Sequence, residues 1–250
     1  LVALGGYAVR MGYNVLHYTL ELGEDYVGRR YDSFFTQIPV DRITKHKDKV
    51  EEILPQVPGN LVIKEFPTGK ATIHTIEAHI KKCIDLDINP DLILIDYVDL
   101  LSSKRKTVDR KAEIDDIYVG TKGLAKELNT PIWSVSQVNR AGAKDDIIEG
   151  DKAAGSYDKM MITDFCLSLS RKAKDKLNGT GRFHIMKNRY GMDGLTFGVK
   201  VNTSIGHFEV HKYDDDDMEA ALERNQQQPT GDYDSYDKKH LKEQFFNLNT

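Results

Sequence analysis

The stretch "DLILIDYVDLL", residues 91–101, decides the fold class of this 250-residue chain. Four consecutive apolar residues, Leu92 to Ile95, come directly before Asp96. A short continuous apolar run is typical of a strand that is buried on both faces, as in a parallel sheet. A carboxylate at the end of such a strand is costly unless something pairs with it. We therefore expect Asp96 to hold a ligand, or to cap the turn that follows.

Apolar stretches of strand type alternate with helical patterns along the first half of the chain. The stretches that predict strands are 14–22, 61–66, 91–98 and 131–137. The stretches that predict helices are 1–13, 23–37, 72–86 and 110–128, with short helices and turns over 38–60. Residues 164–172, 181–188 and 195–202 predict closing strands, the last two as antiparallel neighbours. The sequence therefore predicts an α/β fold with a mostly parallel central sheet flanked by helices.

The composition indicates a soluble protein with a sizeable core. Hydrophobic residues make up 40 % of the chain and charged residues 30 %, and the mean hydropathy is −0.50. There is no apolar run near the roughly 18 residues of a membrane span and no signal-peptide pattern at the start. Cys83 and Cys166 lie far apart in apolar surroundings, so we expect free thiols in a reducing compartment, the cytoplasm.

Charge divides the chain into two parts. Residues 212–250 contain five Lys or Arg and ten Asp or Glu, a net −5, which leaves residues 1–211 at +1 against the total of −4. We expect a folded domain over 1–211 and an acidic, disordered tail over 212–250. Apolar residues over 241–248 are either a frayed end or a short helix that docks on a partner protein.

Three polar residues fall at carboxyl ends of predicted strands, where ligands bind in sheets of this kind. Asp96 could orient Mg²⁺ beside nucleotide phosphates, and Glu21 could polarise an attacking water. Gln137 could contact a γ-phosphate and couple it to a mobile loop over 138–160. Taken singly, each residue is also compatible with an ordinary cap or turn.

Two further stretches carry polar side chains that suit a polyanion. "MKNRYG", residues 186–191, places Lys187 and Arg189 two apart, on one side of a strand end. These cations suit a phosphate bound by a neighbouring subunit, or a solvated hairpin. Lys152 and Gly155 lie in a small-residue run that lets backbone amides approach a phosphate. The carboxylates around them equally allow a merely flexible loop.

Two motifs are set aside. "PTGKAT", residues 67–72, does not fit the phosphate-binding pattern G-x-x-x-x-G-K-[ST], because Lys64 replaces the first glycine and Ala71 the hydroxyl residue. Thr72 is a more plausible helix cap. His207 and His211 have a helical metal spacing but lie in a strand-like stretch, which favours a structural role.

The order of these motifs resembles the RecA-like motor domain of DnaB-type replicative helicases, with a divergence typical of a bacteriophage member. The resemblance covers nearly all of residues 1–211. It rests on "HYTLEL" (17–22), "DLILIDYVDLL" (91–101), "LAKELNTPIWSVSQVNR" (124–140), "GDKAAGS" (150–156) and "MKNRYG" (186–191).

The resemblance implies an ATP- and Mg²⁺-dependent DNA helicase that acts as a hexameric ring on single-stranded DNA. It makes Glu21 the catalytic glutamate, Gln137 the γ-phosphate sensor, and Lys187 and Arg189 the pair that reaches a neighbour's site. It makes Asp96 the residue that orients Mg²⁺, either directly or through water.

The resemblance also implies that Arg30 lies near the nucleotide and that Lys152 and Gly155 contact DNA. The family usually has Arg followed by Glu where this chain has Lys152 and Ala153, and Lys lacks the bidentate fork of Arg. Primase, a helicase loader or a polymerase would be the protein partners, in the cytoplasm of a bacterial host.

The family's P-loop is missing from these 250 residues. We therefore expect an amino-terminally truncated motor domain that does not hydrolyse ATP alone. Two alternatives remain: a recombinase-type ATPase that forms filaments on DNA, and a non-catalytic RecA-like interaction module. Residues 138–160 are poor in aromatic residues, which disfavours a strand-exchange loop, and the retained polar residues disfavour the non-catalytic module.

Overall fold

The computed structural model describes residues 1–103, 110–137, 147 and 157–212. Its first sheet is wholly parallel, with strand order β2-β1-β3-β4. The strands are β1 (Val15–Thr19), β2 (Leu61–Glu65), β3 (Leu92–Asp96) and β4 (Ile132–Ser134).

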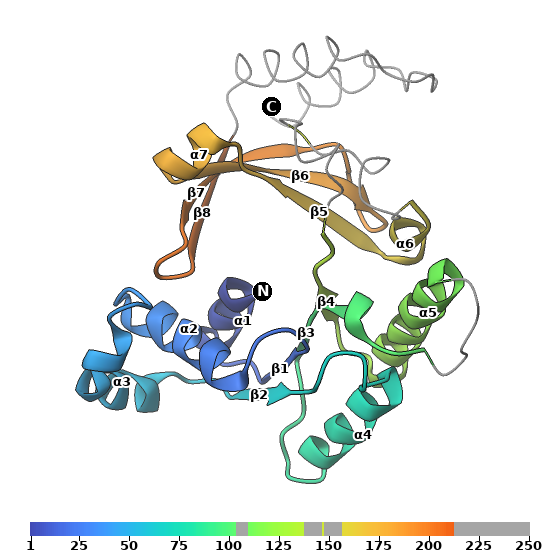
Figure 1. The fold of residues 1–250 in the computed structure, drawn as a ribbon, viewed down its shortest axis with the longest axis horizontal. Coiled ribbons are helices and arrows are strands. Elements are labelled where there is room, and N and C mark those ends of the chain that lie inside the picture. Colours follow the sequence, from blue (N-terminus) through green and yellow to red (C-terminus); the bar gives the residue numbers. More distant parts are fainter. Residues whose placement is uncertain (104–109, 138–146, 148–156, 213–250) are drawn as a thin grey trace.

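Helices cover both faces of this sheet (Figure 1). One face carries α1 (Val2–Arg10) and α2 (Glu24–Thr36), with α3 (Lys47–Ile53) beside them between the 3-10 turns η1 (Ile43–Lys45) and η2 (Leu54–Gln56). The other face carries α4 (Ile73–Ile84) and α5 (Arg110–Leu128), and η3 (Val98–Leu100) follows β3. The predicted parallel sheet flanked by helices is confirmed.

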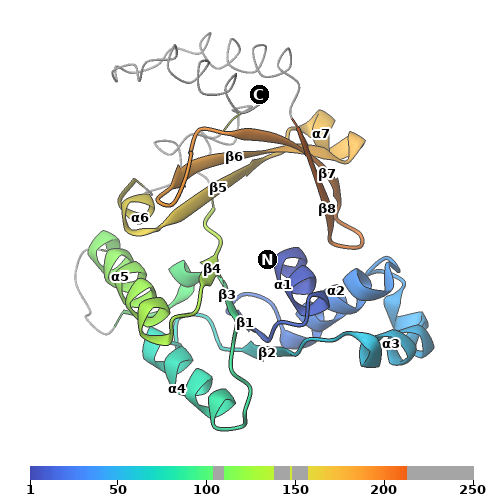
Figure 2. The ribbon, with the colours of Figure 1, turned by 180° about the vertical axis from the view of Figure 1, so that it is seen from behind.

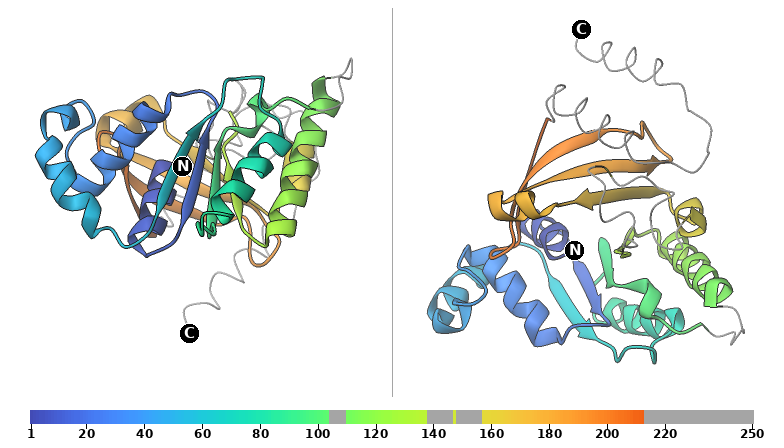
Figure 3. Two further views of the ribbon diagram at one scale, coloured as in Figure 1. Left: turned by 90° about the horizontal axis from the view of Figure 1, so that it is seen from below. Right: turned by 45° about the horizontal axis from the view of Figure 1, so that its top comes forward.

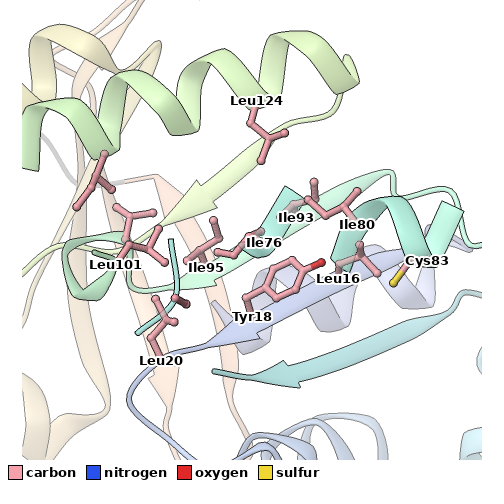
Figure 4. Packing of buried hydrophobic residues seen from close by; sticks show 13 residues of the cluster. Leu16, Tyr18, Leu20, Ile76, Ile80, Cys83, Ile93, Ile95, Leu101 and Leu124 are labelled. Carbon is pink, nitrogen blue, oxygen red and sulfur yellow. The ribbon is translucent and has the colours of Figure 1, made fainter. Parts of the chain in front are cut away.

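Alternate residues of β1 and β3 enter two separate cores, as the side-chain period of a strand requires. Leu16 and Ile93 pack with Ile76 and Ile80 of α4 (Figure 4). Val15, Leu92 and Leu94 pack with helices α1 and α2 on the opposite face. Each fully buried aliphatic side chain contributes about 1.5–3 kcal/mol, so the two cores fix the carboxyl ends of β1 and β3 in place.

The carboxy-terminal strands form an antiparallel sheet of their own, in the order β5-β6-β7-β8 (Figure 2). These strands are β5 (Phe165–Ser170), β6 (Thr180–Asn188), β7 (Thr196–Asn202) and β8 (His207–Lys212). The predicted antiparallel pairing of the last two expected strands is confirmed. The hairpin end of β7 and β8 rests on α1 and α2, where Ser33 Oγ donates to the carbonyl of Ser204 at 3.0 Å.

Several local expectations need correction. The predicted loop 138–160 was too long, because α6 (Tyr157–Ile162) occupies its end (Figure 3). Helix α7 (Ala173–Asn178) was not predicted, and the strand-like stretch around His207 and His211 was given no bounds. β1 ends at Thr19 and β4 at Ser134, short of Glu21 and Gln137. Sheet bonding stops where the neighbouring strand stops, which the apolar pattern alone does not reveal.

Other local expectations are confirmed. Thr72 caps α4, accepting the Thr75 amide in a capping box. His207 and His211 lie in β8, a strand, as their strand-like stretch predicted. Cys83 and Cys166 are free thiols. The tail 213–250 lies outside the described residues.

A glycine in α1 allows this helix to pack closely against α2. An added Cβ at Gly5 would overlap the Tyr31 hydroxyl and lie 2.8 Å from Leu94 Cδ1. We therefore expect Gly5→Ala to lower the free energy of unfolding by about 1–3 kcal/mol through overpacking. Gly123→Ala in α5 is the matched control, because nothing lies within 4 Å of its added Cβ. It should raise stability by about 0.5–1 kcal/mol, and urea unfolding of both variants checks the difference.

Candidate functional site

The register of β1 against β3 sets the geometry of the site. Thr19 pairs with Asp96 in the parallel ladder, and the Leu20 amide donates to the Asp96 carbonyl at 2.8 Å. Glu21 is the residue after Leu20. The carboxylates of Glu21 and Asp96, which are far apart in the sequence, therefore lie at the same edge of the sheet. Both are sequence-predicted site residues, and the structure brings them together.

Among the described residues, the Asp96 side chain lacks a close polar partner, although cationic groups lie near it. Its carboxylate makes no hydrogen bond or ion pair with the part of the chain that the structure describes. Burial raises the pKa of Asp96; the Leu1 amino group lowers it, the Glu21 charge raises it and the Arg30 charge lowers it, in decreasing order of effect. The charge of a partly buried carboxylate without a close polar partner suits a cation.

Arg30 of α2 belongs to the same group of charges. Its Nη2 donates to the Tyr26 hydroxyl at 3.1 Å, and its guanidinium lies 4.8 Å from the Tyr26 ring centroid. Its Nε is buried and has no hydrogen-bond partner among the described residues. A buried donor without a partner suits an incoming acceptor such as a phosphate oxygen.

The amino end of α1 also faces this edge of the sheet. The start of α1 lies near both Asp96 and His17, because a charge placed at Leu1 affects the pKa of each. A helix amino end presents backbone N–H groups and a positive dipole, which favour an anion. The structure thus gathers Glu21, Asp96, Arg30 and a helix amino end around one position.

A buried polar pair beneath this position was not predicted. His17 Nδ1 lies 2.7 Å from the Tyr31 hydroxyl, and His17 is 1 % exposed. Burial, followed by the Leu1 amino group, lowers the pKa of His17 to about 3, so the ring is neutral near pH 7. Nothing in the sequence indicated this pair, because His17 lies within an apolar run whose residues are all buried in β1.

Gln137 lies at the same edge, three residues beyond β4, and is exposed. The residue before it, Ser136, donates to Asp99 Oδ2 at 3.1 Å. Asp99 in turn lies three residues after Asp96. The backbone next to Gln137 is therefore held to the turn that follows Asp96.

Lys187 and Arg189 lie against α6, a different part of their own chain. Lys187 Nζ donates to the carbonyls of Met160 and Met161 at 2.8 and 2.9 Å. Arg189 Nη1 lies 3.0 Å from Asp164 Oδ1. The two cations share one neighbourhood, as their spacing predicts. Lys152 and Gly155 lie outside the described residues.

A concave surface lies elsewhere, between α2 and α3. This groove measures about 700 Å³ and is lined in part by the carboxylates of Glu24, Asp25, Asp32 and Glu51. Burial raises the pKa of Asp32. Arg29 and Lys47 also line the groove, but its carboxylates outnumber these two cations. A lining with a net negative charge does not favour a phosphate, so we do not assign the groove to the sheet-edge site.

Comparisons with known proteins identify the family of this chain. The family model described as "DnaB-like helicase C terminal domain" matches residues 5–209. A DnaB-like replicative helicase of Enterobacteria phage T4 is 23 % identical over 203 residues, which are 76 % of this chain and 43 % of that protein. Replicative DNA helicase DnaB of Rickettsia felis is 42 % identical over 53 residues, 21 % of this chain and 11 % of that protein. The chain thus spans less than half the length of these relatives.

Solved structures share the fold. One, described as an ATPase domain, superposes with a TM-score of 0.70 at 18 % identity, covering 84 % of this chain and 78 % of that one. A structure described as a DnaB-like replicative helicase and its interactions with primase gives 0.71 at 18 % identity, covering 85 % and 55 %. In the described part of this chain, no helix is both long and apolar enough to span a membrane. The match of this family model over residues 5–209 shows that this chain belongs to the DnaB-like helicase C-terminal domain family.

Proposed function

We propose that this chain is the nucleotide-hydrolysing motor part of a replicative DNA helicase, one that works as a hexameric ring and moves along single-stranded DNA. The observation that carries the proposal is the pairing of Thr19 with Asp96, because it places Glu21 beside Asp96. A carboxylate that holds the metal and a carboxylate that accepts a proton from the water are two of the protein groups that support phosphoryl transfer to water.

The residues fit Mg²⁺ and a nucleoside triphosphate such as ATP. Asp96 is half-buried without a protein partner, Arg30 Nε is a buried donor without one among the described residues, and the α1 amino end favours anions. Asp96 would hold Mg²⁺ or its water, Arg30 would donate to a phosphate, and Glu21 would accept a proton from the attacking water. Gln137 would contact the γ-phosphate. Bound Mg²⁺ would neutralise charge on the phosphate oxygens.

Lys187 and Arg189 would serve the site of a neighbouring subunit. The side chains of Arg189 and Asp164 are 49 % and 33 % exposed, and an exposed ion pair contributes only about 0–1 kcal/mol. Arg189 can therefore leave Asp164 for a neighbour's phosphate at little cost. Asp164 keeps Lys122 as a second partner at 2.7 Å, so its charge would remain paired after the exchange.

Single-stranded DNA would be held by the segment that carries Lys152 and Gly155, and the tail 212–250 would bind a replication protein such as a primase, loader or polymerase. A cytoplasmic location in a bacterial host follows from this assignment.

No G-x-x-x-x-G-K-[ST] motif occurs in the 250 residues. Tests of hydrolysis therefore use a completed motor, defined as this chain with such a segment placed ahead of Leu1.

Asp96→Asn tests the proposal in the completed motor. It should weaken Mg²⁺-dependent nucleotide binding and abolish hydrolysis, because the amide carries no charge for the metal. The free protein should become more stable near pH 7: a raised pKa in the folded state means that ionised Asp96 opposes folding above its unfolded pKa. Titration with a fluorescent nucleotide, with and without Mg²⁺, and thermal unfolding measure both effects. Unchanged Mg²⁺-dependent binding would favour the non-catalytic module.

A further inference from the structure

Asp164 and Arg189 face each other at the end of the antiparallel ladder between β5 and β6. The register of this ladder pairs Phe165 with Asn188, and Asp164 and Arg189 lie one residue beyond that pair. The Arg189 amide donates to the Asp164 carbonyl at 2.9 Å, and Arg189 Nη1 lies 3.0 Å from Asp164 Oδ1. Asp164 therefore holds both the backbone and the side chain of the arginine that is proposed to reach a neighbour's site.

Lys122 of α5 shares the carboxylate oxygen that Arg189 contacts. Its Nζ donates to Asp164 Oδ1 at 2.7 Å and to the Ile162 carbonyl at 2.7 Å, where α5 and α6 lie side by side (Figure 1). The hydrogen bond from Lys122 lowers the pKa of Asp164. A smaller effect of burial raises it, and the charges of Lys122, Arg189 and Lys126 lower it further. Asp164 is thus an ionised carboxylate that two cations share, and their mutual repulsion weakens its hold on each.

The two cations differ in how firmly they are held. The Lys122 side chain is 21 % exposed and has the Ile162 carbonyl as a second acceptor. The Arg189 side chain is half-exposed, and its guanidinium has no second acceptor among the described residues. An exposed ion pair contributes little free energy. Arg189 is therefore the partner that can leave Asp164, while Lys122 stays.

Lys187 adds a third positive charge to this group. Its Nζ is fixed on the Met160 and Met161 carbonyls. Burial, and after it the charges of Arg189 and Lys122, lowers the pKa of Lys187, which shows that the three cations lie near one another. One carboxylate, Asp164, thus stands against three cations. An excess of positive charge favours a further anion beside Arg189.

We propose that Asp164 and Lys122 are positioning residues that set how readily Arg189 leaves its own subunit for a phosphate bound by the neighbouring subunit. Asp164 holds the guanidinium at rest, and Lys122 limits the strength of that hold. This inference rests on the proposed function. Breaking the resting contact costs free energy, so a tighter contact lowers the affinity of the neighbouring site for nucleotide. Removing the Asp164 charge and removing the Lys122 charge should therefore have opposite effects.

The resting contact is tested first in this chain alone. Phenylglyoxal reacts faster with guanidinium groups that make no ion pair, and mass spectrometry gives the rate at Arg189 relative to that at Arg42, an exposed arginine before η1. Asp164→Asn, which keeps the backbone contact, should raise this relative rate. Lys122→Met, which leaves Arg189 as the main partner of Asp164, should lower it. Each change should reach at most about five-fold, because the contact is exposed.

The consequence for the neighbour's site is tested in rings of the completed motor, by equilibrium binding of a fluorescent, non-hydrolysable ATP analogue. Asp164→Asn should tighten binding and Lys122→Met should weaken it, again by at most about five-fold. In an Arg189→Ala background neither substitution should change the affinity, because both act through Arg189. Glu209→Gln is the matched control, since it removes a carboxylate from the exposed pair with Lys200. Thermal unfolding is recorded for every variant.

Effects of the same sign in Asp164→Asn and Lys122→Met would overturn the inference, because a group that serves the fold alone is weakened by losing either charge. Effects on affinity that persist without Arg189 would overturn it as well. Unchanged reactivity of Arg189 in both variants, with normal nucleotide binding by the unmodified ring, would overturn this inference and leave the proposed function standing. A completed motor that binds no nucleotide would overturn the proposed function, and this inference with it.

Discussion

Replacing Glu21 by Gln in the completed motor is expected to lower the turnover rate by about 10²- to 10⁴-fold, the usual contribution of a positioned general base. The amide keeps the size of the side chain but cannot accept the proton of the attacking water. Nucleotide affinity should stay within a few-fold of the original, because Asp96 and Arg30 are unchanged. Removing the Glu21 charge should also lower the pKa of Asp96, whose ionised form Glu21 opposes.

Single-turnover hydrolysis and equilibrium nucleotide binding separate these effects. Glu51→Gln is the matched control, because Glu51 is an exposed carboxylate on α3 that lines the separate groove. Only the Glu21 variant should lose turnover. If Glu21→Gln hydrolyses ATP at the original rate, Glu21 has no part in the chemistry, and its place beside Asp96 serves the turn after β1.

Rings made wholly of Arg189→Ala subunits should hydrolyse ATP about 10³- to 10⁵-fold more slowly, the range for loss of an arginine that stabilises the transferring phosphate. The informative measurement mixes these subunits with Glu21→Gln subunits, each inactive alone. If Arg189 serves a neighbour, an Arg189→Ala subunit keeps its own Glu21 and receives Arg189 from an adjacent Glu21→Gln subunit. An equal random mixture should then recover about one quarter of the original rate, because each interface needs one particular order of the two types.

No recovery in stable mixed rings would mean that Arg189 acts within its own subunit. Within its own chain Arg189 already has a partner, because its Nη1 lies 3.0 Å from Asp164 Oδ1. Arg29→Ala, which removes an exposed arginine from α2, should leave the rate unchanged and controls for loss of charge.

The expectations that the structure confirms are those that depend on neighbours in the sequence. The apolar run before Asp96 predicted a strand buried on both faces, and Leu92 to Ile95 are all buried. The helix expected over 110–128 has those bounds in the structure. Thr72 caps α4 through a contact with Thr75, three residues away. Periodicity, capping and burial act over one or two turns, so a sequence reader can evaluate them.

Strand ends and the short elements α6, α7 and β8 were predicted less well. A strand ends where its partner ceases to bond to it, and β1 ends at Thr19 because its pairing with β3 ends at Asp96. Short helices are set by the contacts of their ends, as the lysines at the carboxyl end of α6 illustrate. Neither influence is visible in a window of local sequence.

The sequence by itself determined that the chain folds as a parallel sheet between helices and that Glu21, Asp96 and Gln137 follow strands of that sheet. Only the tertiary structure decided which polar groups meet: Glu21 beside Asp96 through the β1–β3 register, and Asp99 with Lys159 across 60 residues of chain. The physical reason is the range of the forces. Apolar burial leaves a periodic mark along the chain, whereas a hydrogen bond depends on positions within about 3 Å, which distant segments acquire only when the whole fold brings them together.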